Sequence, residues 1–172
     1  VQVCVAVPPK TVTEALDLIK QAEAQHADLI EIRLDSLTSF DGIEKLASAT
    51  EIPLIATNRP KDFGGNFSGT ETARQQILFT AAKSGFEYVD VDLGTKNQAE
   101  LVATLHDLGT KVIISFHDFE RTPSLHILHN VLEAQIIAGA DVCKIVTTAT
   151  TMDDNIVTLN LVTRGSKKTN VV

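Results

Sequence analysis

Lys144 and His117 are the two residues of this sequence best suited to covalent and proton-transfer chemistry. Lys144 lies in an apolar, β-branched run over 142–146, where desolvation disfavours the ammonium and favours a nucleophilic amine. A neutral amine in a pocket is suited to Schiff-base formation with a ketone or an aldehyde. His117 ends the preceding apolar run, and an imidazole that titrates near neutral pH suits a general acid and base. The alternatives are a lysine that reaches the rim or pairs with Asp90 or Asp92, and a structural histidine.

Further ionisable residues alternate with apolar ones in similar runs. A strand places successive side chains on opposite faces, so each run has one apolar face and one that becomes polar. Charged groups that converge at strand ends can pair with one another and with a polar ligand, and we expect one shared site there rather than separate salt bridges. The polar set comprises Glu31, Arg33, Asp90, Asp92, His117 and Lys144, with Arg59 at the end of the third run.

Short β-branched runs alternate with longer helical patterns along the whole chain. The expected strands are 2–7, 29–34, 52–58, 87–93, 111–117 and 142–146, with a seventh that starts near 170. The first expected helix is one that Thr13 could cap, with Val12, Leu16, Ile19 and Ala22 on one face. The others are 41–49, 69–84, 96–108, 123–138 with Thr122-Pro123 at its start, and 152–163.

Strict alternation of strands and helices predicts a parallel sheet covered by helices. A doubly wound sheet would be apolar on both faces, so the polar face favours a (β/α)8 TIM barrel. A complete barrel usually needs about 250 residues, whereas this chain has 172. We therefore expect a single domain over 1–172 that is an incomplete barrel, with the last quarter outside the chain. The one methionine, Met152, agrees with a fragment.

Composition excludes several classes of protein. Lys and Arg number 15 against 22 Asp and Glu, which leaves a net charge of −7 and argues against partners such as nucleic acid or an anionic membrane. No apolar run approaches a membrane span, and no signal peptide is recognisable. Cys4 and Cys143 lie in apolar runs, so we expect buried thiols of a reducing cytoplasm. His126 and His129 have metal-compatible spacing but lack a third ligand.

Four segments resemble type I 3-dehydroquinate dehydratase in order and spacing. They are Glu-Ile-Arg-Leu-Asp at 31–35, Thr-Asn-Arg at 57–59, Ser-Phe-His-Asp-Phe at 115–119 with Thr122-Pro123, and Gly-Ala-Asp-Val-Cys-Lys-Ile at 139–145. The resemblance implies a cytoplasmic (β/α)8 barrel, usually a homodimer, that uses no metal and no organic cofactor. It also implies a hydro-lyase that catalyses the syn dehydration of 3-dehydroquinate to 3-dehydroshikimate. This reaction belongs to the shikimate pathway of aromatic amino acid biosynthesis.

The resemblance also implies roles for five residues. Lys144 would form an imine with the C3 ketone of the substrate, which acidifies the C2 proton. His117 would remove that proton and protonate the departing C1 hydroxyl. Three residues would bind substrate hydroxyls and shape the pocket: Glu31, Arg33 and Arg59.

Two departures from the family pattern qualify this expectation. Phe63 stands where the family has a glutamate before a Gly-Gly pair, and whether Asp62 substitutes for it is open. The family's arginine for the substrate carboxylate, and a serine and a glutamine on a closing loop, would lie beyond Val172. The chain by itself is therefore expected to be inactive or very weak. The alternatives are another Schiff-base barrel lyase of the aldolase kind and a non-catalytic truncated barrel.

Overall fold

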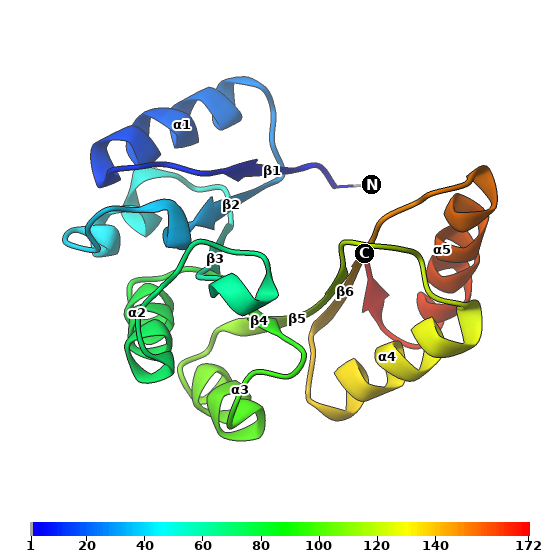
Figure 1. The fold of residues 1–172 in the computed structure, drawn as a ribbon. Coiled ribbons are helices and arrows are strands. Elements are labelled where there is room, and N and C mark those ends of the chain that lie inside the picture. Colours follow the sequence, from blue (N-terminus) through cyan, green and yellow to red (C-terminus); the bar gives the residue numbers. More distant parts are fainter. Residues whose placement is uncertain (1) are drawn as a thin grey trace. The chain divides into compact units, whose positions relative to one another are not determined.

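Seven strands in one parallel sheet form the framework of the protein. The computed structural model describes residues 2–172. The strands follow one another in the sheet in chain order, and each agrees with an expected strand to within about two residues (Figure 1). They are β1 (Cys4–Val7), β2 (Leu29–Arg33), β3 (Leu54–Thr57), β4 (Tyr88–Asp92), β5 (Lys111–Asp118), β6 (Val142–Thr147) and β7 (Asn170–Val171).

Five α-helices connect the strands. They are α1 (Val12–Ala24), α2 (Glu71–Lys83), α3 (Gln98–Asp107), α4 (Leu125–Ile137) and α5 (Met152–Gly165). The expected caps of two helices are wrong. Thr11 caps α1, because its hydroxyl accepts the Glu14 amide, and Ser124 caps α4 in the same way through the Ile127 amide.

The helix expected over 41–49 is also wrong. Only two short 3-10 turns occur there, Ile43–Lys45 and Ala47–Ala49. Gly42 precedes the first turn with a φ of 91°, a left-handed conformation that a continuous α-helix does not contain. The apolar side chains of this segment are nevertheless buried, Ile43 at the start of the first turn and Leu46 between the two turns.

The chain packs as two compact units, which we describe separately. Unit 1 comprises the described residues up to Asp90 together with Ala103–Lys111, and unit 2 comprises Val91–Val102 and Val112–Val172. In unit 1, α1 contacts β1 and β2, and α2 contacts β3. The buried apolar residues of this unit include Ile30 and Ile32 on β2, Val89 on β4, Ile19 on α1 and Leu78 on α2.

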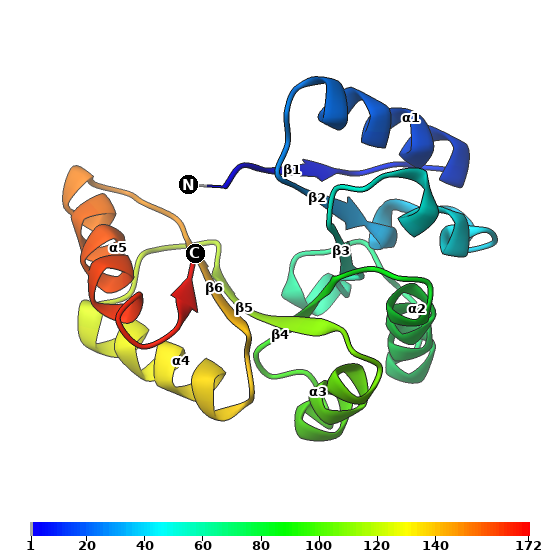
Figure 2. The same cartoon turned by 180° about the vertical axis from the view of Figure 1, so that it is seen from behind.

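Unit 2 has its own core between β5–β7 and two helices. Helices α4 and α5 lie side by side in both views (Figures 1 and 2). Their buried side chains pack with one face of the strands through Leu128, Leu132, Cys143, Leu161 and Val171. The apolar side chains on one face of β5 and β6 thus pack against the two helices. The alternate positions, which carry the ionisable residues, lie on the opposite face.

The two cysteines differ in exposure. Both are free thiols, and Cys143 is buried as expected, but Cys4 is exposed. The expectation for Cys4 is wrong because β1 is the first strand of the sheet and pairs with β2 alone. Among residues 2–172, no helix is both long and apolar enough to cross a membrane.

Candidate active site

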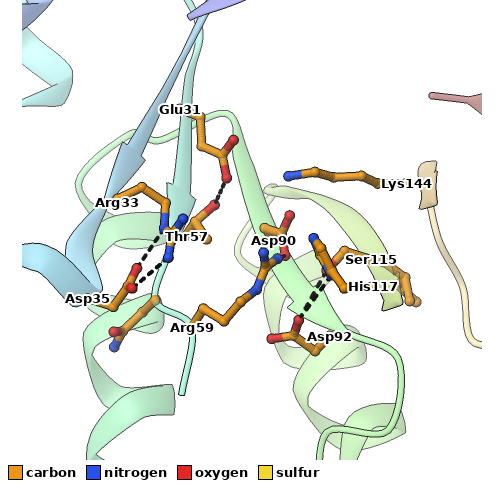
Figure 3. A network of polar contacts seen from close by, with 12 residues as sticks. Glu31, Arg33, Asp35, Thr57, Arg59, Asp90, Asp92, Ser115, His117 and Lys144 are labelled. Atoms are coloured by element: carbon orange, nitrogen blue, oxygen red, sulfur yellow. Dashed lines mark hydrogen bonds and ion pairs between the residues drawn. The ribbon is translucent and has the colours of Figure 1, made fainter. Parts of the chain in front are cut away.

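In unit 1, polar side chains form a row across the ends of three strands. The strand register pairs Arg33 with Thr57, and Thr57 with Asp90. Paired residues of neighbouring parallel strands share a face, so these side chains lie on one face of the unit. Glu31 precedes Arg33 by two positions on that face, and its Oε1 accepts a hydrogen bond of 2.7 Å from the Thr57 hydroxyl (Figure 3).

Arg33 is held by a carboxylate directly after its strand. Its Nε and Nη2 donate to the two oxygens of Asp35 at 2.9 and 2.7 Å, a bidentate pair (Figure 3). Asp35 also accepts from the backbone amide of Asn66 at 3.0 Å. Burial by itself would raise the pKa of Asp35, but the hydrogen bonds and charge of Arg33 and the Asn66 amide outweigh burial and lower that pKa. The same hydrogen bond raises the pKa of Arg33. Arg33 is therefore a fixed cation.

Arg59 is a second cation in unit 1, and it is almost completely buried. Its Nη2 donates to Oδ1 of Asp90 at 2.9 Å, with 6% and 1% of the two side chains exposed. The following loop returns to Arg59, whose carbonyl accepts from the Phe67 amide at 3.1 Å. Gly65 is required in this loop, since a Cβ there would lie 2.0 Å from the Arg59 carbonyl oxygen. The loop therefore packs directly against the Arg59 backbone.

In unit 2, the strand register brings the expected catalytic lysine and histidine to the same face. Ser115 on β5 pairs with Lys144 on β6, and His117 lies two positions beyond Ser115 on β5. Both predicted residues therefore come from neighbouring strands and alternate positions that share a face. On the helix side, the buried Gln135 of α4 donates to the carbonyls of Ile114 and Lys144, each at 2.9 Å. This bridge fixes the backbone from which Lys144 extends.

Two side chains of unit 2, Asp92 and Phe119, contact the His117 ring. Its Nδ1 lies 3.8 Å from Oδ1 of Asp92, and the same oxygen lies 3.4 Å from the Ser115 hydroxyl (Figure 3). Phe119 stacks on the ring with centroids 5.5 Å apart and an angle of 22° between the planes. Asp92 therefore restrains the Nδ1 edge of the ring, and Phe119 restrains one of its faces.

Sequence reasoning did not identify several residues that hold the candidate groups. They are Asp35 and Thr57 in unit 1, and Ser115 and Gln135 in unit 2. Thr57 and Ser115 could have been found from strand parity, because both share the polar face with the predicted set. Gln135 carried a weaker signal as a polar residue among apolar helix positions. The link between Asp35 and Asn66 spans 31 residues and has no local signature.

The two helical histidines do not form a metal site. No group of three or more potential ligands of the His, Cys, Asp and Glu types gathers anywhere in residues 2–172. His126 is exposed, in agreement with a solvent-facing position, while His129 is half-buried. Asp62, the possible substitute for a loop glutamate, lies exposed in the 3-10 turn Lys61–Phe63.

Comparison with solved structures establishes the fold class. The 3-dehydroquinate dehydratase of Geobacillus kaustophilus superposes with a TM-score of 0.91 over 99% of this chain and 72% of its own, at 21% identity. A type I 3-dehydroquinate dehydratase from Clostridium difficile, solved with covalently modified comenic acid, gives a TM-score of 0.87 at 26% identity, over 99% of this chain and 73% of its own. Together with the seven parallel strands in chain order, this likeness defines an incomplete (β/α)8 barrel fold.

Sequence comparison then identifies the family. The family model for type I 3-dehydroquinase matches residues 3–172. The 3-dehydroquinate dehydratase of Methanococcus maripaludis strain C6 is 33% identical over 170 residues, which cover 96% of this chain and 76% of that protein. The chain belongs to the type I 3-dehydroquinase family. The family match confirms the resemblance and places the protein among the dehydratases rather than the aldolases.

Proposed function

We propose that this protein catalyses the dehydration of 3-dehydroquinate to 3-dehydroshikimate through an imine on Lys144. Family membership supplies the reaction class. The observation that carries the assignment of residues is the register of β5 and β6, in which Lys144 lies beside Ser115 with His117 two positions further along the same face. An amine and an imidazole at this spacing can act on adjacent carbons of one small substrate.

The proposed reaction has three stages. The Lys144 amine adds to the C3 ketone and a water molecule is lost, which forms the imine. His117 removes the C2 proton, and the electron pair moves into the imine, which acts as the electron sink. The pair then returns to expel the C1 hydroxyl, which His117 protonates, and water hydrolyses the imine to release Lys144. The net change is the loss of one water from the substrate.

For unit 1 we propose roles in substrate binding. Arg33 and Arg59 are cations fixed by Asp35 and Asp90, and each can donate hydrogen bonds to substrate hydroxyls without losing its carboxylate partner. Glu31 is oriented by Thr57 and can accept a hydrogen bond from a hydroxyl. Groups held in place in this way bind a polar ligand with little further loss of conformational entropy.

Four broader properties complete the proposal. The reaction uses no metal and no organic cofactor, because the covalent imine supplies the electron sink. The protein works in the cytoplasm as a homodimer, in line with the family resemblance. The residues 1–172 form one catalytic barrel domain that lacks its last quarter in this chain.

Borohydride trapping tests the imine. In a complete chain, incubation with 3-dehydroquinate and sodium borohydride should reduce the imine to a stable amine adduct, measured as a mass increase and located on Lys144 by peptide mapping. The Lys144→Ala variant should give no adduct. Lys111→Ala is the matched control, because Lys111 is an exposed lysine on β5 and its loss should leave the adduct unchanged. An adduct that persists in Lys144→Ala would remove the proposed role of this lysine.

A further inference from the structure

Asp92 places a buried carboxylate beside the imidazole to which we assign proton transfer. The two atoms that approach are Asp92 Oδ1 and His117 Nδ1, at 3.8 Å, with 3% and 7% of the side chains exposed. Hydrogen bonds to catalytic groups commonly shorten when substrate binds, so this separation is within reach of a direct contact. The Ser115 hydroxyl, 3.4 Å from the same carboxylate oxygen, lies on the neighbouring position of β5 that shares the face (Figure 3).

The backbone around Asp92 is fixed from several sides within unit 2. Its carbonyl accepts from the Thr95 amide and from the Gln98 side chain, both at 3.0 Å. The next residue, Leu93, donates its amide to the Ser115 carbonyl at 2.7 Å. These bonds join the end of β4 to β5 at the residue that also shares the face with His117. The backbone from which the carboxylate extends is therefore held by contacts that do not involve the imidazole.

Asp118, the carboxylate next to His117 in sequence, is engaged elsewhere. Its Oδ1 accepts from the amides of Glu120 and Arg121, each at 3.0 Å, and so closes the turn after β5. Adjacent residues of a strand also point to opposite faces. Lys144 shares the face with His117 but carries a donor rather than an acceptor. Asp92 is therefore the carboxylate of unit 2 placed to accept a hydrogen bond from Nδ1–H of His117.

We propose that Asp92 is the positioning residue for His117, a proposal that rests on the proton-transfer role assigned above. A carboxylate at Nδ1 favours the tautomer with hydrogen on Nδ1, which leaves the lone pair of Nε2 to accept the substrate proton. The same carboxylate stabilises the imidazolium that forms after that transfer. Ser115 holds the carboxylate, and Phe119 holds the plane of the ring.

Nitrogen NMR of the His117 ring tests this directly and needs no turnover. In the full chain labelled with 15N-histidine, we expect the neutral ring to be protonated on Nδ1. Asp92→Asn should move the neutral ring toward the Nε2-protonated tautomer, because the amide can donate to Nδ1. Asp92→Glu keeps the carboxylate and should retain the original tautomer. Circular dichroism establishes that each variant is folded. If Asp92→Asn does not fold, the parent chain keeps the proposal falsifiable, because a neutral ring protonated on Nε2 in the parent would overturn it.

Activity provides the second readout. In a barrel completed with its last quarter, Asp92→Asn should lower kcat on the order of 10²-fold with KM changed by less than about twofold, since the lost interaction acts in the transition state. Asp92→Glu should restore much of that loss. The control Asp153→Asn removes an exposed carboxylate from α5 and should change neither tautomer nor kcat.

The outcomes separate this inference from the proposed function. An unchanged tautomer in Asp92→Asn, or a tautomer that follows Asp118→Asn instead, would overturn the positioning role. If no borohydride adduct forms at Lys144 in the parent while the His117 tautomer still depends on Asp92, the imine proposal is overturned. The positioning of His117 by Asp92 then still stands.

Discussion

Two arginines of this protein, Arg33 and Arg59, show how a carboxylate partner holds a cation in place for the proposed ligand binding. Arg33 and Arg59 each have a carboxylate partner in hydrogen-bond contact, at 2.7 and 2.9 Å. Breaking such a pair leaves an uncompensated charge, which costs more than the pair itself contributes. The partners therefore orient the two guanidinium groups, which carry several N–H donors each.

The weight of His117 can be measured by removing its side chain. In a barrel completed with its last quarter, His117→Ala should reduce kcat by about 10²–10⁴-fold, the usual contribution of a positioned acid and base. His126→Ala, which removes an exposed histidine from α4, is the control and should leave steady-state kinetics unchanged. A loss of less than about tenfold in His117→Ala would assign proton transfer to another group.

The Asp35–Arg33 pair should make stability depend on pH in the acid range. Because folding lowers the pKa of Asp35, its contribution is complete above the ordinary value of 3.8 and declines as pH falls through the lower folded-state value. Asp35→Asn should cost about 2 kcal/mol near neutral pH, the scale of hydrogen bonds to a charged group. Urea unfolding between pH 7 and pH 2.5 should show this difference shrinking below pH 3.8.

Asp17→Asn is the control for that experiment, because Asp17 is exposed on α1. Its unfolding free energy should differ little from that of the parent at any pH. A difference for Asp35→Asn that stays constant down to the lowest pH would show that the carboxylate does not act through its charge.

At the scale of elements, the loop after β3 is as important as the strand itself. It returns to Arg59 through the Phe67 amide, and Gly65 donates to the Pro60 carbonyl at 3.0 Å. Asp35 accepts from Asn66 of the same loop, so this loop contacts both arginine systems of unit 1. The strand places Arg59 at its end, and the loop contacts the Arg59 backbone and Asp35, the partner of Arg33.

Substitution of Gly65 tests the importance of this close approach. Gly65→Ala would place a Cβ 2.0 Å from the Arg59 carbonyl oxygen, so the loop must move. We expect a loss of stability of about 1–3 kcal/mol, as in overpacked sites. In a barrel completed with its last quarter, we expect a KM raised on the order of tenfold with kcat less affected. Thermal unfolding and steady-state kinetics provide the two measurements.

Ser68→Ala is the matched control in the same loop, since Ser68 is exposed. It should leave both stability and KM within experimental error of the parent. If Gly65→Ala also left KM unchanged while lowering stability, the loop would have a structural role without a role in binding.

At the scale of the whole molecule, the fold is that of the dehydratases while the chain is shorter than they are. It covers 76% of the Methanococcus maripaludis enzyme and 72% of the Geobacillus kaustophilus one. The match nevertheless includes the strands that carry Lys144, His117, Glu31 and Arg33, together with the residue after β3, Arg59. This chain therefore contains all five residues to which the proposed function gives a role.

The proposed homodimer is a prediction at this scale. Sedimentation equilibrium should give about twice the chain mass of 18.6 kDa at micromolar concentration. A single species at the mass of one chain over that range would contradict the proposal. The measurement does not depend on activity, so it stands apart from the trapping and kinetic experiments.

The sequence by itself determined the order of the strands along the chain, most of the helices, the apolar and polar faces, and the pair of Lys144 and His117. These features depend on local periodicity and on motifs within single segments, which a linear pattern records. The family resemblance rested on the same local segments and is confirmed by the comparisons. Short 3-10 turns at 41–49 escaped this reasoning because their apolar spacing imitates a helix.

Only the tertiary structure decided which groups hold the candidate residues. Asp35 meets Asn66, Ser115 meets Asp92, and Gln135 meets the Lys144 carbonyl through contacts between different elements. The exposure of Cys4 likewise follows from the place of β1 in the sheet rather than from its own apolar run. Strand register and loop closure depend on packing between segments distant in sequence, and short-range patterns carry no record of that packing.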